Sequence, residues 1–462
     1  MVIISIILAA GEGTRMKSKL PKVLHQVCGK PMLSHVIEAS KGAGIKENIV
    51  IVGHGKEKVK DTIKEEGVVF VEQPIGEKVP YGTGFAVMQA EDLIKDDNYV
   101  IILYGDTPLI TSKTITDLID YHRKNGNNAT VLTAEFDNPT GYGRIIRDDK
   151  GNIIGIVEEK DATIEQKRIR EINSGIYCFD GKYLKMALHN LNSNNAQNEY
   201  YITDSIKILN EKGLKVGGYK LNDNTEIFGV NSRVQLAEAD RIMRRRINEK
   251  LMLSGVTIID PDNTYIGKDV QIGRDTIIYP GVFLEGNTKI GEDCIIGSNS
   301  RIINSNIGSR VVVQSSTIID SEVGENTTIG PYAYLRPNSK IGKSVKIGDF
   351  VEVKNSVIGD NSKASHLAYI GDADVGRNVN IGCGVVFVNY DGVNKHRTIV
   401  EDNAFIGSNS NLVAPVIVRE KGYVAAGSTI TEEVGKGTLS IARARQVNKE
   451  GWIERKFNKN KE

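Results

Sequence analysis

Cysteine and tryptophan are scarce in this chain of 462 residues, and the few cysteines are scattered. They are Cys28, Cys178, Cys294 and Cys383. No CxxC pair occurs among them, which argues against a zinc site and against a disulfide framework. Single, widely spaced cysteines are typical of proteins from a reducing compartment, so we predict a cytoplasmic protein.

The chain also lacks an excess of charge of one sign and any long hydrophobic run. Its 59 Lys and Arg residues balance 58 Asp and Glu residues, which leaves no general reason to expect nucleic acid or a membrane surface as a partner. The opening apolar stretch, 2–10, runs straight into a glycine loop, so we predict a buried strand rather than a signal peptide. No segment approaches the roughly 20 apolar residues of a transmembrane helix.

The second half of the chain contains a repeated pair, an aliphatic residue followed by glycine, at multiples of about six residues. The aliphatic members are Ile266, Ile272, Ile290, Ile296, Ile307, Val323, Ile329, Ile341, Ile347, Ile358, Ile370, Val375, Ile381 and Ile406. A hexapeptide period is typical of a parallel β-helix, in which each hexad supplies one short strand and one corner. We expect the aliphatic side chains to point inward and the glycines to supply permissive backbone near the corners. Three hexads then form one coil of about 18 residues.

The first half alternates apolar strands with amphipathic helices. The predicted strands are 2–10, 48–52, 68–71, 99–104, 129–134, 153–157 and 175–179, and clear helical stretches are 32–43 and 114–124. This alternation indicates an α/β domain with a mostly parallel sheet. Ligands of such sheets lie at the carboxyl ends of the strands.

The length of the chain predicts more than one domain. We expect an α/β domain over 1–230, a linker helix over 231–253, a β-helix over 254–437 and a C-terminal tail over 438–462, docked or partly ordered. One loop, near 389–398, interrupts the hexads. The linker helix carries three consecutive arginines, for which solvation or pairing with Glu238 and Asp240 is a better explanation than nucleic-acid binding.

A glycine loop and a carboxylate follow two of the predicted strands. Gly11 and Gly13 come directly after the first strand, where backbone N–H groups can bind phosphates, and Arg15 and Lys22 could neutralise a triphosphate. Asp106 follows the strand 99–104, as suits Mg²⁺, which takes one or two carboxylates together with phosphate oxygens. By itself, Asp106 could also be a helix N-cap or a turn residue.

Several motifs, read in order, resemble those of the sugar-1-phosphate nucleotidyltransferases. They are LAAGEGTRM with a later PK, LYGD, GYGRI, IVEEKDA, EINSGIY and FGVN; in the second half, SHLAYIGD, NIGCG and NYDGVNKH look like acetyltransferase motifs. Taken together, nearly the whole chain is similar to the family of bacterial bifunctional N-acetylglucosamine-1-phosphate uridyltransferases and glucosamine-1-phosphate acetyltransferases.

That resemblance implies a fold and a pair of reactions. The fold is α/β, with a nucleotide-diphospho-sugar transferase-like Rossmann-type domain, a connecting helix and a left-handed parallel β-helix. The enzyme would acetylate glucosamine-1-phosphate with acetyl-CoA and then transfer a uridylyl group from UTP to N-acetylglucosamine-1-phosphate, as peptidoglycan synthesis requires. Mg²⁺ would be the cofactor, and such β-helices usually form homotrimers.

The resemblance also implies the residues of the uridylyl site. Gly11, Arg15 and Lys22 would hold the triphosphate, Asp106 and Asn231 the Mg²⁺, and Gly143, Glu158 and Asn173 the sugar. The other expected nucleotide contacts are Leu8, Ala9, Ala10, Gln73, Gly82 and Thr83. The loop from Gln73 to Phe85 departs from the family pattern, because it is longer and has Phe where the family has His. We therefore expect relaxed selection of the base, so that a nucleotide other than UTP is also accepted.

In the β-helix, Arg336 and Lys354 are three hexads apart and should stack in adjacent coils, where a phosphate would relieve their repulsion. They could also be ordinary solvated cations. His366 is a candidate general base, since a neutral imidazole can accept the proton of an amine, although it could simply pack a corner. It lies two hexads beyond Lys354 and so on another face, and a neighbouring chain would complete a site that needs both.

The resemblance assigns His366 as the catalytic residue. It assigns the acetyl acceptor to Arg336, Lys354, Tyr369, Asn380 and Lys395, and acetyl-CoA to Cys383, Asn389, Tyr390, Ser408, Ala426 and Arg443. Ser408 and Ala426 are again three hexads apart and could line one groove. Cys383 replaces an expected alanine, and we interpret it as a small residue compatible with the core rather than a catalytic thiol.

Two other functions fit parts of the sequence. A monofunctional nucleotidyltransferase with a structural or regulatory β-helix would not need His366, Asn389, Tyr390 and Arg443. A non-catalytic scaffold with a degenerate nucleotidyl domain would not need the intact set of Arg15, Lys22, Asp106 and Asn231. Both alternatives are therefore disfavoured.

Overall fold

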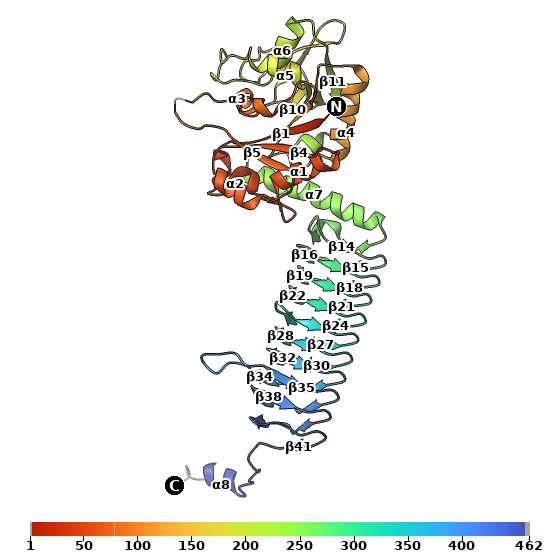
Figure 1. Ribbon diagram of the computed structural model, residues 1–462. Coiled ribbons are helices and arrows are strands. Elements are labelled where there is room, and N and C mark those ends of the chain that lie inside the picture. Colours follow the sequence, from red (N-terminus) through yellow and green to blue (C-terminus); the bar gives the residue numbers. More distant parts are fainter. Residues whose placement is uncertain (1, 78, 458–462) are drawn as a thin grey trace. The chain divides into compact units, whose positions relative to one another are not determined.

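The computed structural model describes residues 2–77 and 79–457 (Figure 1). It divides into two compact units, Met1–Arg244 and Arg245–Glu462. The division falls inside helix α7 (Arg233–Leu253), a run of 21 residues without glycine or proline. Among the helices of the described ranges, none combines the length and the apolar character that crossing a membrane requires.

The first unit is built on one mixed β-sheet with the strand order β11-β7-β10-β6-β1-β4-β5, to which β8 and β9 are attached at β10. The strands are β1 (Ile3–Ala9), β4 (Glu47–Val52), β5 (Val68–Glu72), β6 (Tyr99–Tyr104), β7 (Ala129–Glu135), β8 (Arg144–Arg147), β9 (Ile153–Val157), β10 (Glu171–Asp180) and β11 (Val216–Lys220). A small separate ribbon pairs β2 (Gln26–Val27) with β3 (Lys30–Pro31).

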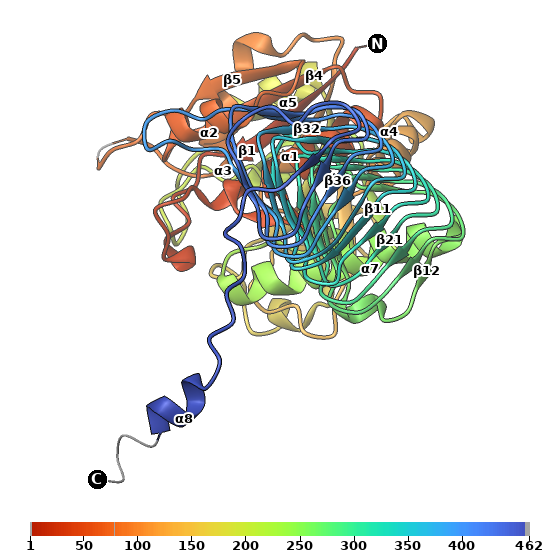
Figure 2. The same ribbon diagram turned by 90° about the horizontal axis from the view of Figure 1, so that it is seen from below.

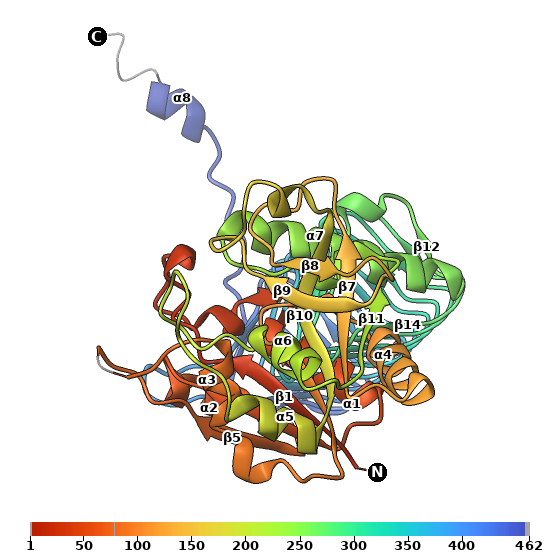
Figure 3. The same ribbon diagram turned by 90° about the horizontal axis from the view of Figure 1, so that it is seen from above.

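Helices cover both faces of this sheet (Figure 1, Figure 3). Residues of α1 (Met32–Gly42), α2 (Lys56–Thr62) and α4 (Ser112–Asn125) share one core with Ile7 of β1. Residues of α3 (Thr83–Met88), α5 (Gly181–Leu188) and α6 (Asp204–Glu211) share the opposite core with Ile4 and Ile6. Because both faces are covered, the central strands are continuously apolar, which is why the sequence pattern identified them.

The predicted strands of this unit are present, but the sheet is less uniformly parallel than expected. β1 pairs in parallel with β4 and β6, whereas β10 runs antiparallel to both β6 and β7. Strands β8 and β11 were not predicted, since β11 contains two consecutive glycines and β8 carries an arginine at each end. β10 is also longer than expected and has a bulge between Asn173 and Tyr177.

The second unit is a parallel β-helix of three sheets (Figure 1, Figure 2). The first face runs from β12 (Thr257–Ile258) to β41 (Leu439–Ser440), the second from β13 (Tyr265–Ile266) to β40 (Thr429–Ile430), and the third from β14 (Gln271–Ile272) to β38 (Val416–Val418). Strand partners lie one coil apart, as in Ile278↔Ile296 and Ile296↔Val313. The period is therefore three hexads, and some coils are slightly shorter.

One apolar core runs through the stack, and the predicted inward residues fill it. All of them are buried except Ile272, which is partly buried against the core near its start. The hexad glycines serve a different purpose from the one expected. An added Cβ at Gly324 would lie 2.6 Å from backbone atoms of Gly342, so glycine permits close stacking of coils. The left-handed corners are held mainly by other residues, such as Asn326 and Asn361.

The predicted interruption of the hexads is present as a loop between β34 (Val386–Val388) and β35 (Thr398–Val400). The stack continues beyond residue 437, because β41 pairs with β39 (Tyr423–Val424). Helix α8 (Trp452–Phe457) follows near the end of the described residues, and all of its side chains are exposed.

Candidate active sites

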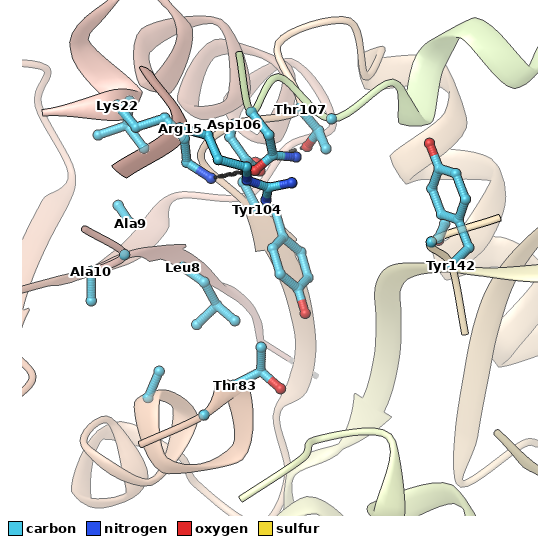
Figure 4. A pocket seen from close by; sticks show the side chains of 18 of the residues that line it. Leu8, Ala9, Ala10, Arg15, Lys22, Thr83, Tyr104, Asp106, Thr107 and Tyr142 are labelled. Carbon is cyan, nitrogen blue, oxygen red and sulfur yellow. Dashed lines mark hydrogen bonds and ion pairs between the residues drawn. The ribbon is translucent and has the colours of Figure 1, made fainter. Parts of the chain in front are cut away.

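The first unit contains a cavity of about 550 Å³ at the carboxyl ends of β1 and β6 (Figure 4). Most of the residues predicted to bind the nucleotide line it. These are Leu8, Ala9, Ala10, Gly11, Arg15, Lys22, Gln73, Gly82, Thr83, Asp106 and Asn231. The sheet thus gathers residues that are far apart in the sequence at one edge, as parallel strands do with their carboxyl ends.

The glycine loop after β1 is open on its cavity side. An added Cβ at Gly11 would meet no other atom within 4 Å, so a ligand can approach the backbone there. Gly13 has a positive φ of 68°, and its added Cβ would lie 2.7 Å from the Cβ of Lys22. This glycine therefore allows the loop to pass close to Lys22, and the exposed Arg15 follows in a short 3₁₀ turn.

Three polar side chains converge at the edge of the cavity. The ammonium of Lys22 forms an ion pair with Asp106 and donates a hydrogen bond of 3.1 Å to Oδ1 of Asn231 (Figure 4). The backbone N–H of Val230 donates to the carbonyl of Asp106, which ties the two segments together. A carboxylate oxygen and an amide oxygen therefore already face a single cation.

This donor set fits a divalent cation of the Mg²⁺ type. Such an ion prefers oxygen ligands, needs only one or two from the protein, and completes its shell with phosphate oxygens and water. Asp106 and Asn231 supply two oxygens at one point. Within the described residues no cluster of three or more His, Cys, Asp or Glu side chains could hold a metal by itself, so the ligand would have to complete the site.

The loop that departs from the family pattern is anchored at its second half. The N–H of Gly84 donates to the carbonyl of Tyr200 and the N–H of Tyr200 donates to the carbonyl of Tyr81. Gly82 has a φ of 118°, and a Cβ there would lie 2.4 Å from the Tyr200 carbonyl oxygen, so no larger residue fits. Gln73 is almost completely buried at the start of the loop and lines the cavity.

The three predicted sugar residues lie together but do not line the cavity. The N–H of Asn173 donates to the carbonyl of Gly143. The amide nitrogen of Asn173 donates to the hydroxyl of Tyr177 at 2.7 Å. Glu158 approaches Gly143 and accepts a hydrogen bond from the hydroxyl of Thr203 at 3.2 Å. Burial raises the pKa of Glu158 above its usual value, although the Thr203 hydrogen bond opposes this.

Several other residues line the cavity, although they were not predicted to. They include Tyr81, Tyr104, Thr107, Tyr142, Ser174 and Glu199. Tyr104 belongs to the LYGD motif, and its ring points toward Thr83 (Figure 4). Gly175, in the β10 bulge, leaves room for this ring, because an added Cβ would lie 2.7 Å from it. Tyr104, Tyr142 and Ser174 had a signal in the sequence, their places in the motifs LYGD, GYGRI and EINSGIY.

In the second unit, four of the predicted residues meet at the corner between the second and third faces. Lys354 ends β28 (Glu352–Lys354), and Tyr369 begins β31 (Tyr369–Gly371) in the next coil. The amide nitrogen of Asn389 donates to the hydroxyl of Tyr369 at 3.3 Å. The N–H of His396 donates to the carbonyl of Asn389, which brings the adjoining Lys395 to the same corner, and the neighbouring Lys354 ammonium lowers the pKa of Lys395.

Arg336 and Lys354 lie in adjacent coils, as predicted, but their charges are not left to repel each other as expected. The N–H of Arg336 donates to the carbonyl of Val353, so the two cations belong to adjacent coils. Each of them already faces a carboxylate. Arg336 forms an ion pair of 2.8 Å with Glu352, and the Lys354 ammonium lies 4.0 Å from Asp372. The two cations therefore do not depend on a shared anion for their neutralisation.

His366 ends β30 (Lys363–His366) on the first face, at the corner that leads to the second. Its Nδ1 lies 2.6 Å from Oδ1 of Asp349, the residue paired with it one coil earlier. A carboxylate only accepts hydrogen bonds, so Nδ1 carries a proton here and Nε2 is left with the lone pair when the ring is neutral. The hydrogen bond to His366 lowers the pKa of Asp349. Asp349 was not predicted, although it holds the same place in the preceding coil.

The predicted acetyl-CoA residues continue the same row of corner positions. In successive coils, Asp349, His366, Cys383 and Ser408 occupy equivalent positions. The carbonyl of Cys383 accepts a hydrogen bond from the N–H of Asn409, and the carbonyl of Ser408 accepts one from the N–H of Gly427. Ala426 follows in the next coil, and its carbonyl accepts a hydrogen bond of 2.7 Å from Arg443. The interpretation of Cys383 as compatible with the core is wrong, because its side chain is exposed at this corner.

Two predicted residues lie apart from both groups. Asn380 begins β33 (Asn380–Ile381) at the corner that comes from the third face. Tyr390 lies in the loop after β34, where its hydroxyl donates to the carbonyl of Gly392. Lys354 and His366 lie on different faces, as their spacing indicated, so the unit does not bring the histidine and the acceptor residues into a single cluster.

Family descriptions match both units. Residues 4–227 match "Nucleotidyl transferase", residues 269–304 and 320–355 match "Bacterial transferase hexapeptide (six repeats)", and residues 397–432 match "Hexapeptide repeat of succinyl-transferase". The chain is 61% identical over 455 residues to the bifunctional protein GlmU of Clostridioides difficile strain 630. It is 62% identical over 452 residues to the protein of the same name from Alkaliphilus oremlandii. Each match covers 98% of both chains.

Proposed function

The chain belongs to the GlmU family of bifunctional proteins, and we propose which of its residues carry the two reactions. The enzyme is a glucosamine-1-phosphate acetyltransferase and an N-acetylglucosamine-1-phosphate uridylyltransferase, and its product is UDP-N-acetylglucosamine. The observation that carries the assignment is the presence of two separate chemical clusters in one chain. The first unit holds Lys22, Asp106 and Asn231, and the second holds Asp349 and His366.

In uridylyl transfer, a phosphate oxygen of N-acetylglucosamine-1-phosphate attacks the α-phosphorus of UTP, and the bond to pyrophosphate breaks. The attacking oxygen is already ionised at neutral pH, so no general base is needed. The reaction requires neutralisation of charge and alignment of the two phosphates. Backbone N–H groups near Gly11, together with Arg15 and Lys22, bind the triphosphate, and Lys22 exchanges its contacts with Asp106 and Asn231 for phosphate oxygens.

Asp106 and Asn231 would hold Mg²⁺, since their oxygens already converge on one cation. When bound, the ion supplies charge neutralisation for the phosphates. Gly143, Glu158 and Asn173 bind the sugar, which then extends from the cavity toward β8 and β10. Gln73 contacts the uracil at the other side, beside Gly82 and Thr83.

In acetyl transfer, the amine of glucosamine-1-phosphate attacks the thioester carbon of acetyl-CoA. Nε2 of His366 accepts the amine proton as the C–N bond forms, and the imidazolium returns a proton to the departing thiolate as the C–S bond breaks. Asp349 holds the ring by its Nδ1–H, which leaves Nε2 as the base. The row that contains Ser408 and Ala426 lies next to His366 and binds the acetyl-CoA.

The acceptor's phosphate binds to Arg336, Lys354 and Lys395, with Tyr369 beside the sugar. Asn389, expected to contact acetyl-CoA, lies with these residues and is assigned to the sugar instead, while Asn380 remains a predicted acceptor residue at another corner. Because this group lies at a different corner from His366, we propose that a homotrimer completes each site, with His366 of one chain facing the acceptor residues of another. The row Tyr332, Phe350 and Leu367 supports this arrangement. These large apolar residues lie at the His366 corner and are 62%, 58% and 58% exposed, as expected for a surface that a second chain covers.

One assay tests the whole assignment. The protein is incubated with glucosamine-1-phosphate, acetyl-CoA, UTP and Mg²⁺, and CoA and pyrophosphate are measured separately. CoA should form without UTP, whereas pyrophosphate should require acetyl-CoA unless N-acetylglucosamine-1-phosphate is supplied. Pyrophosphate formation from glucosamine-1-phosphate at an equal rate without acetyl-CoA would contradict the order of the reactions.

A further inference from the structure

A buried carboxylate, Asp372, lies in the middle of the acceptor residues and has no assigned role. It stands between β31 and β32 (Ala373–Val375), at the corner between the second and third faces, with a φ of 50°. Asn338 and Asn355 occupy the equivalent corner position in earlier coils, so asparagine is a usual residue at this position. Asp372 is only 7% exposed, which is unusual for a charged side chain without a binding or pairing function.

Both oxygens of Asp372 are used by neighbouring coils. The amide nitrogen of Asn355 donates to Oδ1 at 2.6 Å, and the amide nitrogen of Asn389 donates to Oδ2. The ammonium of Lys354 lies 4.0 Å from the same Oδ2. Because a carboxylate can only accept, it fixes which end of each amide faces it. An asparagine in its place would turn an NH₂ group toward one of the two donors.

The charge of Asp372 is maintained despite its burial. Burial alone would raise its pKa, but the hydrogen bonds from Asn355 and Asn389, together with the charges of Lys354 and Lys395, lower it below the usual value. In return, Asp372 places a negative charge beside two ammonium groups that otherwise repel each other. The carboxylate, the two lysines and the two amides therefore form one connected network.

We propose that Asp372 is a positioning residue for acetyl transfer, which aims Lys354 at the acceptor's phosphate and holds Asn389 with its amide oxygen toward the substrate. This inference rests on the proposed acetyltransferase function. The alternative is that Asp372 only completes a ladder of corner residues. Asp320 is a control that distinguishes the two explanations. It is also an aspartate at this corner, with a φ of 44°, but it is exposed and lies in an earlier coil, away from Lys354.

The test compares Asp372→Asn with Asp320→Asn in the full-length protein. The KM for glucosamine-1-phosphate should rise about tenfold or more in Asp372→Asn, which is the scale of a lost hydrogen bond to a charged group. Asp320→Asn should stay within twofold of the parent. Uridylyl transfer from supplied N-acetylglucosamine-1-phosphate should be unchanged in both variants and reports folding. A KM for Asp372→Asn within twofold of the parent would overturn the proposal.

A double-mutant cycle distinguishes positioning from a merely structural role. If Asp372 acts on the KM through Lys354, Asp372→Asn should change the KM less than twofold in a Lys354→Met background. An equal effect in both backgrounds would show that Asp372 acts by another route and would overturn the proposal. If the parent released no CoA at all, the acetyltransferase assignment would fail instead, so the two failures are distinguishable.

A second variant covers the case in which Asp372→Asn does not fold. Asn355→Ser keeps the charge of Asp372 and the fold of the corner but removes the amide that holds Oδ1. We expect the KM for glucosamine-1-phosphate to rise a few-fold, with kcat for uridylyl transfer unchanged. An unchanged KM in this variant would overturn the proposal.

Discussion

The two units build their sites in opposite ways. In the α/β unit, Lys22, Asp106 and Asn231 are separated by long stretches of unrelated sequence, and only the sheet brings them together. In the β-helix, residues that lie side by side are one coil apart in the sequence. Asp349 lies beside His366, and Tyr334 lies beside Glu352.

This difference determines what each unit tolerates. A period shared by neighbouring coils fixes the spacing of side chains along a row, so a change at one coil acts mainly on adjacent coils. The α/β site depends instead on loops at strand ends, each of which has its own conformation. We therefore expect substitutions in the two units to affect different reactions and to differ in their effects on stability.

The largest expected effect is that of His366→Ala on acetyl transfer. Loss of a positioned general base should lower kcat by roughly 10²–10⁴-fold. The KM for glucosamine-1-phosphate should change little, because Arg336 and Lys354 bind the phosphate. Uridylyl transfer from N-acetylglucosamine-1-phosphate serves as the control within the same protein. If the variant kept more than about a tenth of its acetyl-transfer kcat, His366 would be a corner residue and not the base.

The enzyme should discriminate only weakly between the bases of different nucleoside triphosphates. Because the loop from Gln73 to Phe85 departs from the family pattern, we expect dTTP or another nucleoside triphosphate to be used at a measurable fraction of the UTP rate. Initial rates of pyrophosphate release at equal nucleotide concentrations measure this. A preference for UTP of about 10³-fold or more over every other nucleotide, about 4 kcal/mol, would contradict it.

Alanine should be costly at Gly324 in the coils and harmless at Gly155 in the sheet. Gly324→Ala places a Cβ 2.6 Å from the backbone of the next coil, so neighbouring coils must shift. We expect a loss of about 1–3 kcal/mol, the usual cost of overpacking. Gly155→Ala, in β9, is the matched control, since its Cβ would meet nothing within 4 Å. Thermal unfolding followed by circular dichroism would measure both, and equal midpoints would refute the stacking explanation.

The smallest expected effect is that of Asp349→Asn. The amide still reaches His366 but no longer requires a proton on Nδ1, so acetyl-transfer kcat should fall about tenfold; the loss is moderate because the pair is partly exposed. The hydrogen bond from His366 lowers the pKa of Asp349, so this carboxylate is ionised at neutral pH. At neutral pH the ratio of parent to variant kcat should therefore be about ten, and a variant that keeps the parent's kcat would contradict the assignment.

The β-helix could be predicted in detail because its pattern is local and repeated. The aliphatic residue of each hexad faces inward, and a spacing of three hexads was enough to place Arg336 one coil before Lys354. The partners of these cations could not be predicted, because ion pairs such as Arg336 with Glu352 depend on side-chain conformation. Asp349 and Asp372 were missed for a related reason, since their importance follows from buried or shared hydrogen bonds rather than from a motif.

The α/β site was predicted mainly by resemblance. The strand pattern alone placed Gly11 and Asp106 at strand ends, but no pattern connects Asn231 with them. The bulge in β10 and the strands β8 and β11 arise from tertiary contacts that weak local signals do not reveal. The cavity-lining Tyr81 and Glu199 belong to none of the quoted motifs, and only folding brings their segments to the rim.

If each unit carries one reaction, Asp106→Ala should separate the two activities. In an assay that measures CoA and pyrophosphate from the same sample, pyrophosphate release should fall by about 10²–10³-fold, the scale of lost charge stabilisation. CoA release should stay within a few-fold of the parent. Asp137→Ala, at an exposed aspartate of the same unit, should leave both products unchanged. Loss of both activities in folded Asp106→Ala protein would contradict the account of two independent sites.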